Sequence, residues 1–599
     1  MLGERGPQRG LFEADASYLE FVGRDSFYGF LAAQRGNLFR DQDFASLYSK
    51  RLGRPSVAPS LLANALVLQW HDRVSDEETR QRACYDLRWK VALGIPLESK
   101  PFAKSTLQEF RAQLVVHGEQ GQIFRRSLDL AKERGRLKGK LRLALDTTNI
   151  LGRGTVKDTY NLLADGIALV LRVLAGQAGL KVEAYAESAG YGRYLQASSL
   201  KGEAGINWDD AAERRRFLAE IVGDADRLLA VVRQARGRLR QGGLEDQALA
   251  EAAGLLSRVL QQDVERREEG PALREGVAPD RMPSVHDPDM RHGRKSRARR
   301  FDGHKLQMAT DTESQLITDV AVLAGNAADH DQALAVVETS EAHTGCPVEE
   351  AIGDCAYGDG ATRQQFADAG RRLVARVAPV TNQGRFPKTS FQIDLAAKSC
   401  ACPAGQVSRD LRPRGKGSGV FHFAAAVCAA CPLRSDCVRG KGGRSIQVHP
   451  QEALLQTARA FQQSPAFQPY RALRQVAEHR FARLVQLGLR QARYCGRPKT
   501  LFQAFMVATV ANLTLLAASG SANLPLLLLS ACLSSLFIAP GGLLSIKTAP
   551  SLRTTLFPTQ SRHLASALTL APKMADSRPD FSRRRLIGAR SGSRKLVAS

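Results

Sequence analysis

The sequence is poor in aromatic and acidic residues, and each shortage narrows the range of functions. Phe, Trp and Tyr make up 6% of the 599 residues, so recognition of unpaired bases by stacking on exposed rings is not indicated. Asp and Glu number 60 against 85 Lys and Arg, which leaves a formal charge of +25. This excess predicts a polyanionic partner, either nucleic acid or an acidic membrane surface. A ribosome-associated protein and basic tails are alternative explanations of the charge.

Hydrophobic segments of the membrane type are also scarce. Residues 1–10 contain no apolar signal segment. The one membrane-like stretch, between Pro525 and Pro540, is shorter than the roughly 20 apolar residues that a spanning helix needs. A chain of 599 residues predicts two to four structural units, and 44% hydrophobic with 24% charged residues is typical of soluble globular proteins. We therefore expect a cytoplasmic protein without a membrane partner.

Ten cysteines are too few for a disulfide scaffold, but half of them crowd into one short segment. These five are Cys400, Cys402, Cys428, Cys431 and Cys437. Cys428 and Cys431 have the spacing of paired zinc ligands, and Cys402 and Cys437 could complete a set of four thiolates. Cys400 would then be spare, and His422 or His449 could substitute for a thiolate. Free thiols fit the same pattern.

The N-terminal part, residues 1–120, reads as a series of short helices. A helix start is expected at Ser105, where Gln108 would complete a capping box. Short helices with exposed basic residues are typical of DNA-reading modules, although an ordinary helical bundle has the same pattern.

The rest of the chain predicts an α/β core with large insertions. Alternating runs mark strands at 141–145, 304–310, 316–322 and 350–353, and the second and third of these form a hairpin. The predicted organisation is an all-α domain at 1–120, a core at 138–395 with a helical insertion at about 200–285, a cysteine-rich insertion at 396–445, a helical end of the core at 446–518, and a poorly ordered tail at 519–599.

Three acidic residues are placed where they could share a site. Asp146 and Asp354 each follow a predicted strand, at the sheet edge where α/β proteins bind ligands. Glu478 lies in a long helical run that could pack beside them. Three carboxylates suit Mg²⁺, and two such ions can activate a nucleophile and stabilise a leaving oxygen. The alternatives are ordinary strand-end turns and an Arg474–Glu478 pair on a helix surface.

Several short motifs, taken in order, resemble the DDE transposases of bacterial insertion sequences. They are Leu-Ala-Leu-Asp-Thr-Thr at 143–148, Phe-Asp-Gly-His-Lys at 301–305, Gly-Asn-Ala-Ala-Asp at 325–329, Ile-Gly-Asp-Cys-Ala-Tyr-Gly at 352–358, Ala-Glu-His-Arg-Phe at 477–481 and Arg-Tyr-Cys-Gly at 493–496. Residues 61–114 are similar to the helical domain that precedes the catalytic core in this family. The resemblance covers residues 20–518.

The resemblance implies a ribonuclease-H-like mixed sheet with helical and cysteine-rich insertions. It maps the catalytic, metal-binding triad onto Asp146, Asp354 and Glu478, with two Mg²⁺ or Mn²⁺ ions, and favours structural Zn²⁺ in the cysteine segment. The implied reaction is hydrolysis at the element ends, followed by transfer of the 3′-hydroxyl into target DNA. The implied partners are double-stranded DNA, as terminal inverted repeats and target, and a second copy of the chain in a bacterial, nucleoid-associated location.

The chain departs from the family at the signature Tyr-Arg-Glu-Lys around the third acid. Arg474 is in place, but Tyr470 is one position off and Val485 stands where Lys is expected. Arg483 could replace the missing phosphate contact.

The densest basic run, residues 291–300, could hold the DNA backbone, although a solvated loop would look the same. The predicted DNA contacts are Arg291, Arg294, Lys295, Arg297, Arg299, Arg300, Lys305, Arg474 and Arg483. Two other functions fit this sequence. One is a metal-dependent nuclease that cuts without strand transfer, and the other is an inactive DNA-binding remnant of such an element.

Overall fold

The computed structural model describes residues 1–5, 14–51, 53–196, 199–238, 243–296 and 298–521. Most of the predicted tail, the stretch between Pro525 and Pro540, and Arg297 therefore lie outside the described residues. The chain begins with helices α1 (Ala14–Val22), α2 (Phe27–Leu38), η1 (Asp41–Leu47), α3 (Pro59–Asp72), α4 (Asp76–Tyr85), α5 (Leu87–Leu93), α6 (Lys104–Val116) and α7 (Gln122–Glu133). The all-α character of the N-terminal part is confirmed.

The predicted capping box at the start of α6 is wrong. The helix begins at Lys104 after Ala103, whose side chain cannot cap it. Gln108 instead donates to Asp76 at 3.0 Å, together with two hydrogen bonds from Arg111 at 2.9 Å. These contacts tie the start of α4 to α6, so Gln108 serves packing between helices rather than the end of its own helix.

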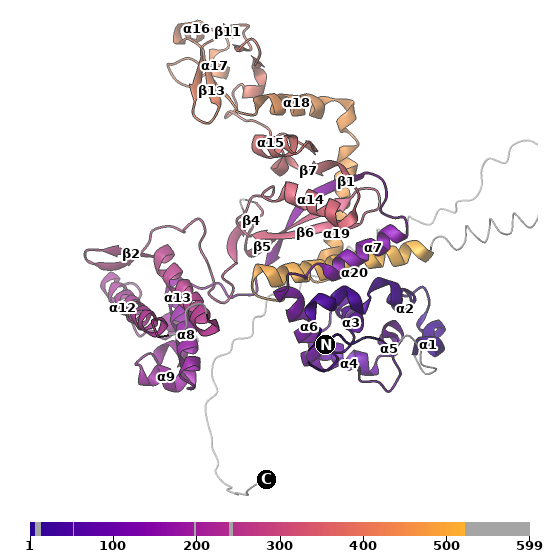
Figure 1. The fold of residues 1–599 in the computed structure, drawn as a ribbon. Coiled ribbons are helices and arrows are strands. Elements are labelled where there is room, and N and C mark those ends of the chain that lie inside the picture. Colours follow the sequence, from indigo (N-terminus) through magenta and orange to yellow (C-terminus); the bar gives the residue numbers. More distant parts are fainter. Residues whose placement is uncertain (6–13, 52, 197–198, 239–242, 297, 522–599) are drawn as a thin grey trace, which may run out of the picture. The chain divides into compact units, whose positions relative to one another are not determined.

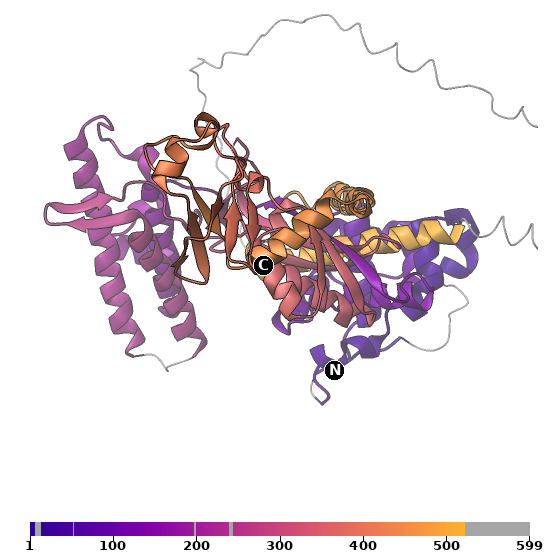
Figure 2. The same ribbon diagram turned by 90° about the horizontal axis from the view of Figure 1, so that it is seen from above.

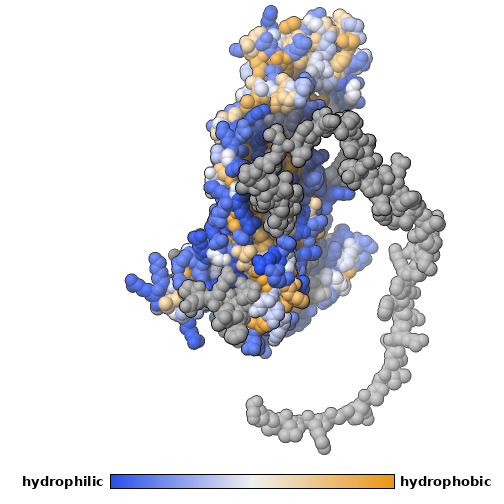
Figure 3. Space-filling view, turned by 90° about the vertical axis from the view of Figure 1, so that its right-hand side faces the viewer, coloured by the Kyte–Doolittle hydropathy of each residue, from blue (hydrophilic) through white to orange (hydrophobic). Residues whose placement is uncertain are grey.

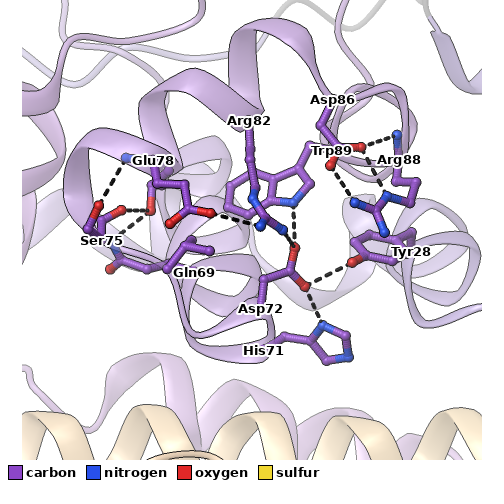
Figure 4. Close-up of polar contacts among 12 residues, drawn as sticks. Tyr28, Gln69, His71, Asp72, Ser75, Glu78, Arg82, Asp86, Arg88 and Trp89 are labelled. Carbon is purple, nitrogen blue, oxygen red and sulfur yellow. Dashed lines mark hydrogen bonds and ion pairs between the residues drawn. The ribbon is translucent and has the colours of Figure 1, made fainter.

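A buried carboxylate fixes the arrangement of α2, α3, α4 and α5 (Figure 4). Asp72, at the end of α3, accepts hydrogen bonds from Tyr28, His71, Arg82 and Trp89 at 2.7–2.8 Å. Burial alone would raise the pKa of Asp72, but the bonds from His71, Trp89 and Tyr28 outweigh it and lower the pKa to about 2. Because Tyr28, Arg82 and Trp89 belong to three other helices, this one carboxylate of α3 joins four helices.

We expect Asp72→Ala to lower the free energy of unfolding of this region by about 3 kcal/mol, because it leaves several buried donors unpaired. The native pKa lies below the unfolded value, so the ionised carboxylate contributes stability above about pH 4 and loses it as the pH falls towards 2. That contribution is about 2 kcal/mol. Urea unfolding followed by tryptophan fluorescence measures both effects, since Trp70 and Trp89 lie in this region. Asp129→Asn, at a half-exposed ion pair, is the control, and an equal loss in both variants would contradict the prediction.

The central sheet is mixed, in the arrangement of ribonuclease-H-like folds (Figure 1). Its strands are β1 (Leu141–Leu151), β4 (Arg291–Arg294), β5 (Arg300–Asp311), β6 (Ile317–Ala324), β7 (Val348–Gly353) and β8 (Arg372–Ala375). The order is β4-β5-β1-β7-β8, with β6 also paired to β5. β5 pairs antiparallel with β1, β4 and β6, whereas β7 pairs parallel with β1 and β8. The predicted hairpin and the α/β fold class are confirmed.

The structure corrects the expected place of Asp146. We predicted that this residue ends its strand, but β1 continues to Leu151 and Asp146 lies near its middle, opposite Met308 of β5. The reason is that β5 supplies hydrogen-bonding partners along the whole of β1. On the other side, the pairing of β1 with β7 stops at Ala144 and Ile352. Asp146 and Asp354 each come two residues after this last pair, so both acids still lie where β7 ends.

The N-terminal helices and the sheet share one hydrophobic core. It runs from Leu31 and Trp89 of the first helices through Leu143 and Met308 of the sheet to Leu513 near the C-terminal end of the described chain. The last helix, α20 (Arg497–Ser521), packs against α3, α7 and β6. Residues 1–120 are therefore not an independently packed domain in this fold, a feature that local sequence pattern cannot show.

The helical insertion is larger than the predicted 200–285. It lies between β1 and β4 and contains α8 (Thr159–Gln177), α9 (Val182–Ser188), α10 (Arg193–Gln196), α11 (Leu200–Glu203), α12 (Ala211–Arg236), α13 (Leu244–Asp263) and the hairpin β2 (Val264–Arg267) with β3 (Gly270–Leu273). α8, α12 and α13 share a hydrophobic core of their own, and the two long helices α12 and α13 run side by side (Figure 2). The apolar stripe of α8 packs against these helices and not against the sheet.

The sheet is covered by further helices, α14 (Ala333–Thr344), α15 (Gly360–Asp368), α18 (Glu452–Gln463), α19 (Tyr470–Gln486) and α20. The predicted long helical run from 450 to 519, which carries Glu478, is thus three α-helices. The chain breaks at Ser464-Pro465 and again between Gln486 and Arg497, where Gly488 has a φ of 95°. By length and composition α8 and α20 could each cross a membrane. Most of each candidate span is buried in one of the two hydrophobic cores, as in a core helix of a soluble protein.

The cysteine-rich segment forms a small β module with its own core of residues such as Phe391, Phe421 and Ile446. Its strands are β9 (Gln392–Asp394), β10 (Ser399–Ala401), β11 (Val407–Ser408), β12 (Leu411–Arg414), β13 (Ser418–His422) and β14 (Ser445–Val448), and its short helices are α16 (Ala425–Ala429) and α17 (Arg434–Cys437). They form two three-stranded sheets, β11-β10-β9 and β12-β13-β14. We call residues 386–449 the cysteine module.

Candidate active site

A pocket of about 570 Å³ opens where β7 ends and α19 passes over the sheet. Two of the three predicted acids, Asp354 and Glu478, line it. Asp354 follows β7 directly, and its Oδ1 accepts a hydrogen bond from the Ala356 N–H at 2.8 Å. Glu478 belongs to α19, which packs against β1, β5 and β7. The pocket therefore collects carboxylates from segments more than 120 residues apart.

Asp146 lies close enough to the other two acids for their charges to act on it. Burial raises the pKa of Asp146 to about 6. The Thr147 N–H opposes this shift, and the carboxylates of Asp354 and Glu478 add to it. An elevated carboxyl pKa among neighbouring acids marks an electrostatically strained cluster, the kind that a bound cation relieves.

Contacts between β1 and the segment that follows α19 hold this end of the helix near the strand that carries Asp146. Arg490 donates from Nη1 to the Asn149 side chain at 2.7 Å and to the Asn149 carbonyl at 2.9 Å. The segment after α19 also pairs with the end of β1, through hydrogen bonds between Leu151 and the backbone of Arg490 and Ala492. These contacts fix the distance between the third acid and the strand that carries the first.

Glu478 is half-exposed and pairs with Arg474, one helical turn earlier, at 2.9 Å. The ion pair that the alternative interpretation expects on the helix surface is therefore present. An exposed pair of this kind contributes well under about 1 kcal/mol, so Glu478 can turn away from Arg474 at little cost.

Two basic residues of the pocket were missed in the sequence. Arg471 and Arg376 line it together with Arg474. Arg471 lies two helical turns before Glu478, so the periodicity of α19 could have revealed it. Arg376 just follows β8, and only the neighbouring position of β7 and β8 brings it to the site. Tyr470 also lines the pocket, but its hydroxyl donates to Glu350 at 3.0 Å.

The donor set fits a hard divalent cation, because it consists of carboxylate oxygens that repel one another. In the described part of the chain, however, no three His, Cys, Asp or Glu side chains are already arranged as a metal cage. Mg²⁺ does not require such a cage, since it commonly binds through one or two carboxylates, waters and substrate phosphates. The residues present therefore fit this ion class, with the substrate completing the coordination.

The basic run around β4 and β5 forms an exposed hairpin. Arg294, Lys295, Arg299 and Arg300 are exposed there, and the Lys295 N–H donates to the Arg299 carbonyl to close the turn. Arg294, Arg300 and Lys305 line a second pocket of about 600 Å³, away from the three acids.

Arg291 and Lys305 are engaged inside the protein. Arg291 is buried, pairs with Asp280 at 2.5 Å and donates to two backbone carbonyls. Lys305 pairs with Asp329 at 2.8 Å and donates to the Ala327 carbonyl. Asp280 lies in the segment that leads from the helical insertion back to β4, so Arg291 holds this segment against the sheet. The local sequence does not reveal this role.

Four cysteines of the module line a single narrow pocket of about 20 Å³: Cys402, Cys428, Cys431 and Cys437. Cys400 is not among them, and it lies buried in the module core. Burial raises the pKa of the Cys437 thiol, and the other three thiols act in the same direction. The Arg444 N–H lies 3.4 Å from the Cys428 sulfur. Four thiols around one pocket have the chemistry of a structural zinc site, although within the described residues their sulfurs are not already arranged as a metal cage.

Comparison with protein-family models gives two matches. A model described as "Transposase domain (DUF772)" matches residues 17–113, which hold α2–α5 and most of α1 and α6. A model described as "Transposase DDE domain" matches residues 401–517, from the cysteine module to α20. Both matches are to transposase domains, and they support a DDE-type insertion-sequence transposase. No curated protein and no solved structure matched this transposase in the corresponding searches.

The matches cover the two ends of the transposase fold. Glu478 lies within the DDE match, whereas Asp146 and Asp354 lie in the region between the two matches. The similarity to transposases therefore rests on the N-terminal helices and the C-terminal part, and the two matches leave the roles of the three acids untested.

Proposed function

We propose that this transposase hydrolyses phosphodiester bonds at the ends of its element and joins the freed 3′-hydroxyl to target DNA, with Asp146, Asp354 and Glu478 holding Mg²⁺ or Mn²⁺. The observation that supports this proposal is that Asp354 and Glu478 line one pocket and that their charges, together with burial, raise the pKa of the nearby Asp146. When bound, such ions activate the attacking oxygen and stabilise the leaving oxygen.

The chain's own residues position the DNA for this reaction. Arg376, Arg471 and Arg474 line the pocket and can hold the phosphates that flank the scissile bond. Glu478 leaves Arg474 when it becomes a ligand, and Arg474 then becomes free for a phosphate. No serine or tyrosine nucleophile is needed, because water and the 3′-hydroxyl are the attacking groups.

The DNA approaches along exposed basic residues. Arg294, Lys295, Arg299, Arg300 and Arg483 are the proposed backbone contacts beyond the pocket. Hydrophilic residues lie over much of the face drawn in Figure 3, as expected of a surface that meets DNA and solvent. The N-terminal helices would recognise the terminal inverted repeats. Two copies of the chain, one at each end, would form the synaptic complex.

We also propose that Cys402, Cys428, Cys431 and Cys437 hold structural Zn²⁺. The shared narrow pocket supports this, as does the Arg444 N–H placed near the Cys428 sulfur. Such an ion would hold α16 and α17 to the sheets, because the four thiols come from three separated segments of the module.

The test is a cleavage assay on DNA that carries the flanking element end, with Mg²⁺ or Mn²⁺, comparing the wild type with Glu478→Gln. We expect nicking at the element boundary by the wild type and a loss of at least about 10²-fold in the variant, because one ligand carboxylate is missing. Glu338→Gln, at an exposed position of α14, is the matched control and should cut normally.

Equal cutting by the wild type and Glu478→Gln would contradict the assignment of the third acid. A joining assay with pre-cut 3′-hydroxyl ends then separates a transposase from a nuclease, since a nuclease does not join them. Salt-sensitive binding without cutting by either protein would identify an inactive remnant.

A further inference from the structure

The cysteine module carries a strongly basic surface that the proposed chemistry does not use. Between residues 398 and 449 there are nine Lys and Arg against two Asp and no Glu, which gives a formal charge of +7. Arg434 and Arg444 are used internally, since they donate to backbone carbonyls of the module. The remaining basic residues are exposed.

Much of this exposed charge lies on one hairpin, formed by β12, β13 and the turn between them. We call residues 409–420 the basic arm. Its arginines and lysine are Arg409, Arg412, Arg414 and Lys416, all exposed, and its single acid is Asp410. Arg412 pairs with Asp410 at 2.8 Å on the surface. Arg409, Arg414 and Lys416 take part in no ion pair within the residues that the structure describes.

The basic arm is slender because small residues fill most of its turn and the first positions of β13. Gly415, Gly417, Ser418 and Gly419 carry little or no side chain. Lys416 and Gly417 have φ of 62° and 74°, which makes a tight turn with the lysine at the tip. A Cβ on Gly419 would lie 2.8 Å from the Leu411 side chain, so Leu411 packs directly over this glycine.

The spacing of the charges follows the strand. Arg412 and Arg414 face the same side of β12, since they are two residues apart. Their Cα atoms are therefore separated by about 6.8 Å, which is two base-pair steps of about 3.4 Å. The base of the arm is fixed, because Val420 and Phe421 are buried in the module core.

We propose that the basic arm lies along the minor groove of A·T-rich DNA and inserts the Arg412 and Arg414 side chains into it. This inference rests on the proposed function in one respect only, namely that the chain works on duplex DNA. The minor groove is about 6 Å wide and attracts arginine side chains most strongly where A·T tracts narrow it, so Arg412 and Arg414 can enter it while the two strands of the arm lie along its opening. The major groove would admit the whole two-stranded arm, but arginine there favours guanine and not A·T pairs. The wide, shallow minor groove of duplex RNA gives no comparable grip. The arm thereby gives the transposase a DNA contact separate from the three acids and from the β4–β5 hairpin.

A simpler explanation exists for part of the arm. Arginine and proline on an edge strand discourage pairing with other sheets, and β12 is an edge strand that contains Pro413. This explanation accounts for Arg412 and Pro413, but it does not require Lys416 at the tip or the row of glycines behind it.

The test measures binding of the full chain, without divalent metal ions, to an A·T-rich and a G·C-rich duplex of equal length. We compare R412A/R414A with K398A/K441A, a control that removes the same charge from exposed sites elsewhere on the module. R412A/R414A should lose about tenfold or more in affinity for the A·T-rich duplex, and with it the preference for A·T. K398A/K441A should lose less than about threefold, equally on both duplexes.

Equal losses in the two double variants, or equal losses on both duplexes in R412A/R414A, would overturn the proposal in favour of diffuse charge. A wild type that binds duplex RNA as tightly as A·T-rich DNA would overturn it as well. A second measurement needs no variant: a minor-groove-binding dye should displace the wild type from the A·T-rich duplex, and unchanged binding would contradict insertion. Since no cutting is measured, a failure of the proposed catalytic function would leave these results unaffected.

Discussion

Asp146→Asn should abolish metal-dependent cutting and leave DNA binding nearly unchanged. We expect the rate to fall by at least about 10³-fold, equivalent to about 4 kcal/mol in the barrier. The reason is that Asp146 is largely buried on β1, the strand against which α19 packs, next to the charges of Asp354 and Glu478. An asparagine keeps the size and the hydrogen bond to the Thr147 N–H but removes the negative charge that a cation needs.

Binding should change by less than about twofold, because phosphate contacts come from arginines and lysines and not from this acid. The measurement pairs a cleavage assay with an anisotropy titration on the same element-end DNA. Asp368→Asn is the matched control, since it changes an exposed aspartate at the end of α15 in the same core. If binding collapsed together with cutting, Asp146 would have a structural role and the catalytic assignment would be wrong.

The second large effect concerns the cysteine module. Cys428→Ser together with Cys431→Ser should abolish zinc binding and unfold residues 386–449, while the rest of the transposase stays folded. Structural zinc supplies about 10–16 kcal/mol of apparent binding energy in small domains, more than the core of this module can replace. The module core is small, being built around a few residues such as Phe391, Phe421 and Ile446.

Zinc content and resistance of the module to proteolysis measure this effect. The wild type should contain about one zinc ion per chain, as expected for four thiolates. Cys400→Ser is the matched control: its thiol lies in the core of the same module but outside the four-cysteine pocket, so this variant should retain zinc. A double variant that keeps full zinc and protease resistance would show that the four thiols do not hold the module together.

The positions of Asp354 and Asp146 in their strands were predictable from the sequence to different extents. Asp354 follows its strand as expected, because β7 ends where the apolar run ends. Asp146 does not end its strand, since the partner strand β5 extends β1 by several residues. The two aspartates nevertheless lie at the same end of β7, because both follow the last residue pair of β1 and β7.

For the basic residues, the sequence did not indicate which side chains are buried and which are exposed. Arg291 and Arg294 look equivalent in the sequence, yet Arg291 is buried against Asp280 and Arg294 is exposed on the hairpin. Asp280 belongs to the returning end of the insertion, whose position depends on how α8, α12 and α13 pack. No local pattern indicates which arginine finds such a partner.

The sequence by itself determined the family, the mixed α/β class, the order of the acids and the identity of the four clustered cysteines. These properties depend on residue type, spacing and order, which are local and readable. The tertiary structure alone decided that α8 belongs to the insertion, that the N-terminal helices share a core with α20, and which charges are free for DNA. The physical reason is that burial and ion pairing depend on which distant segments meet, and that is settled only when the whole chain packs.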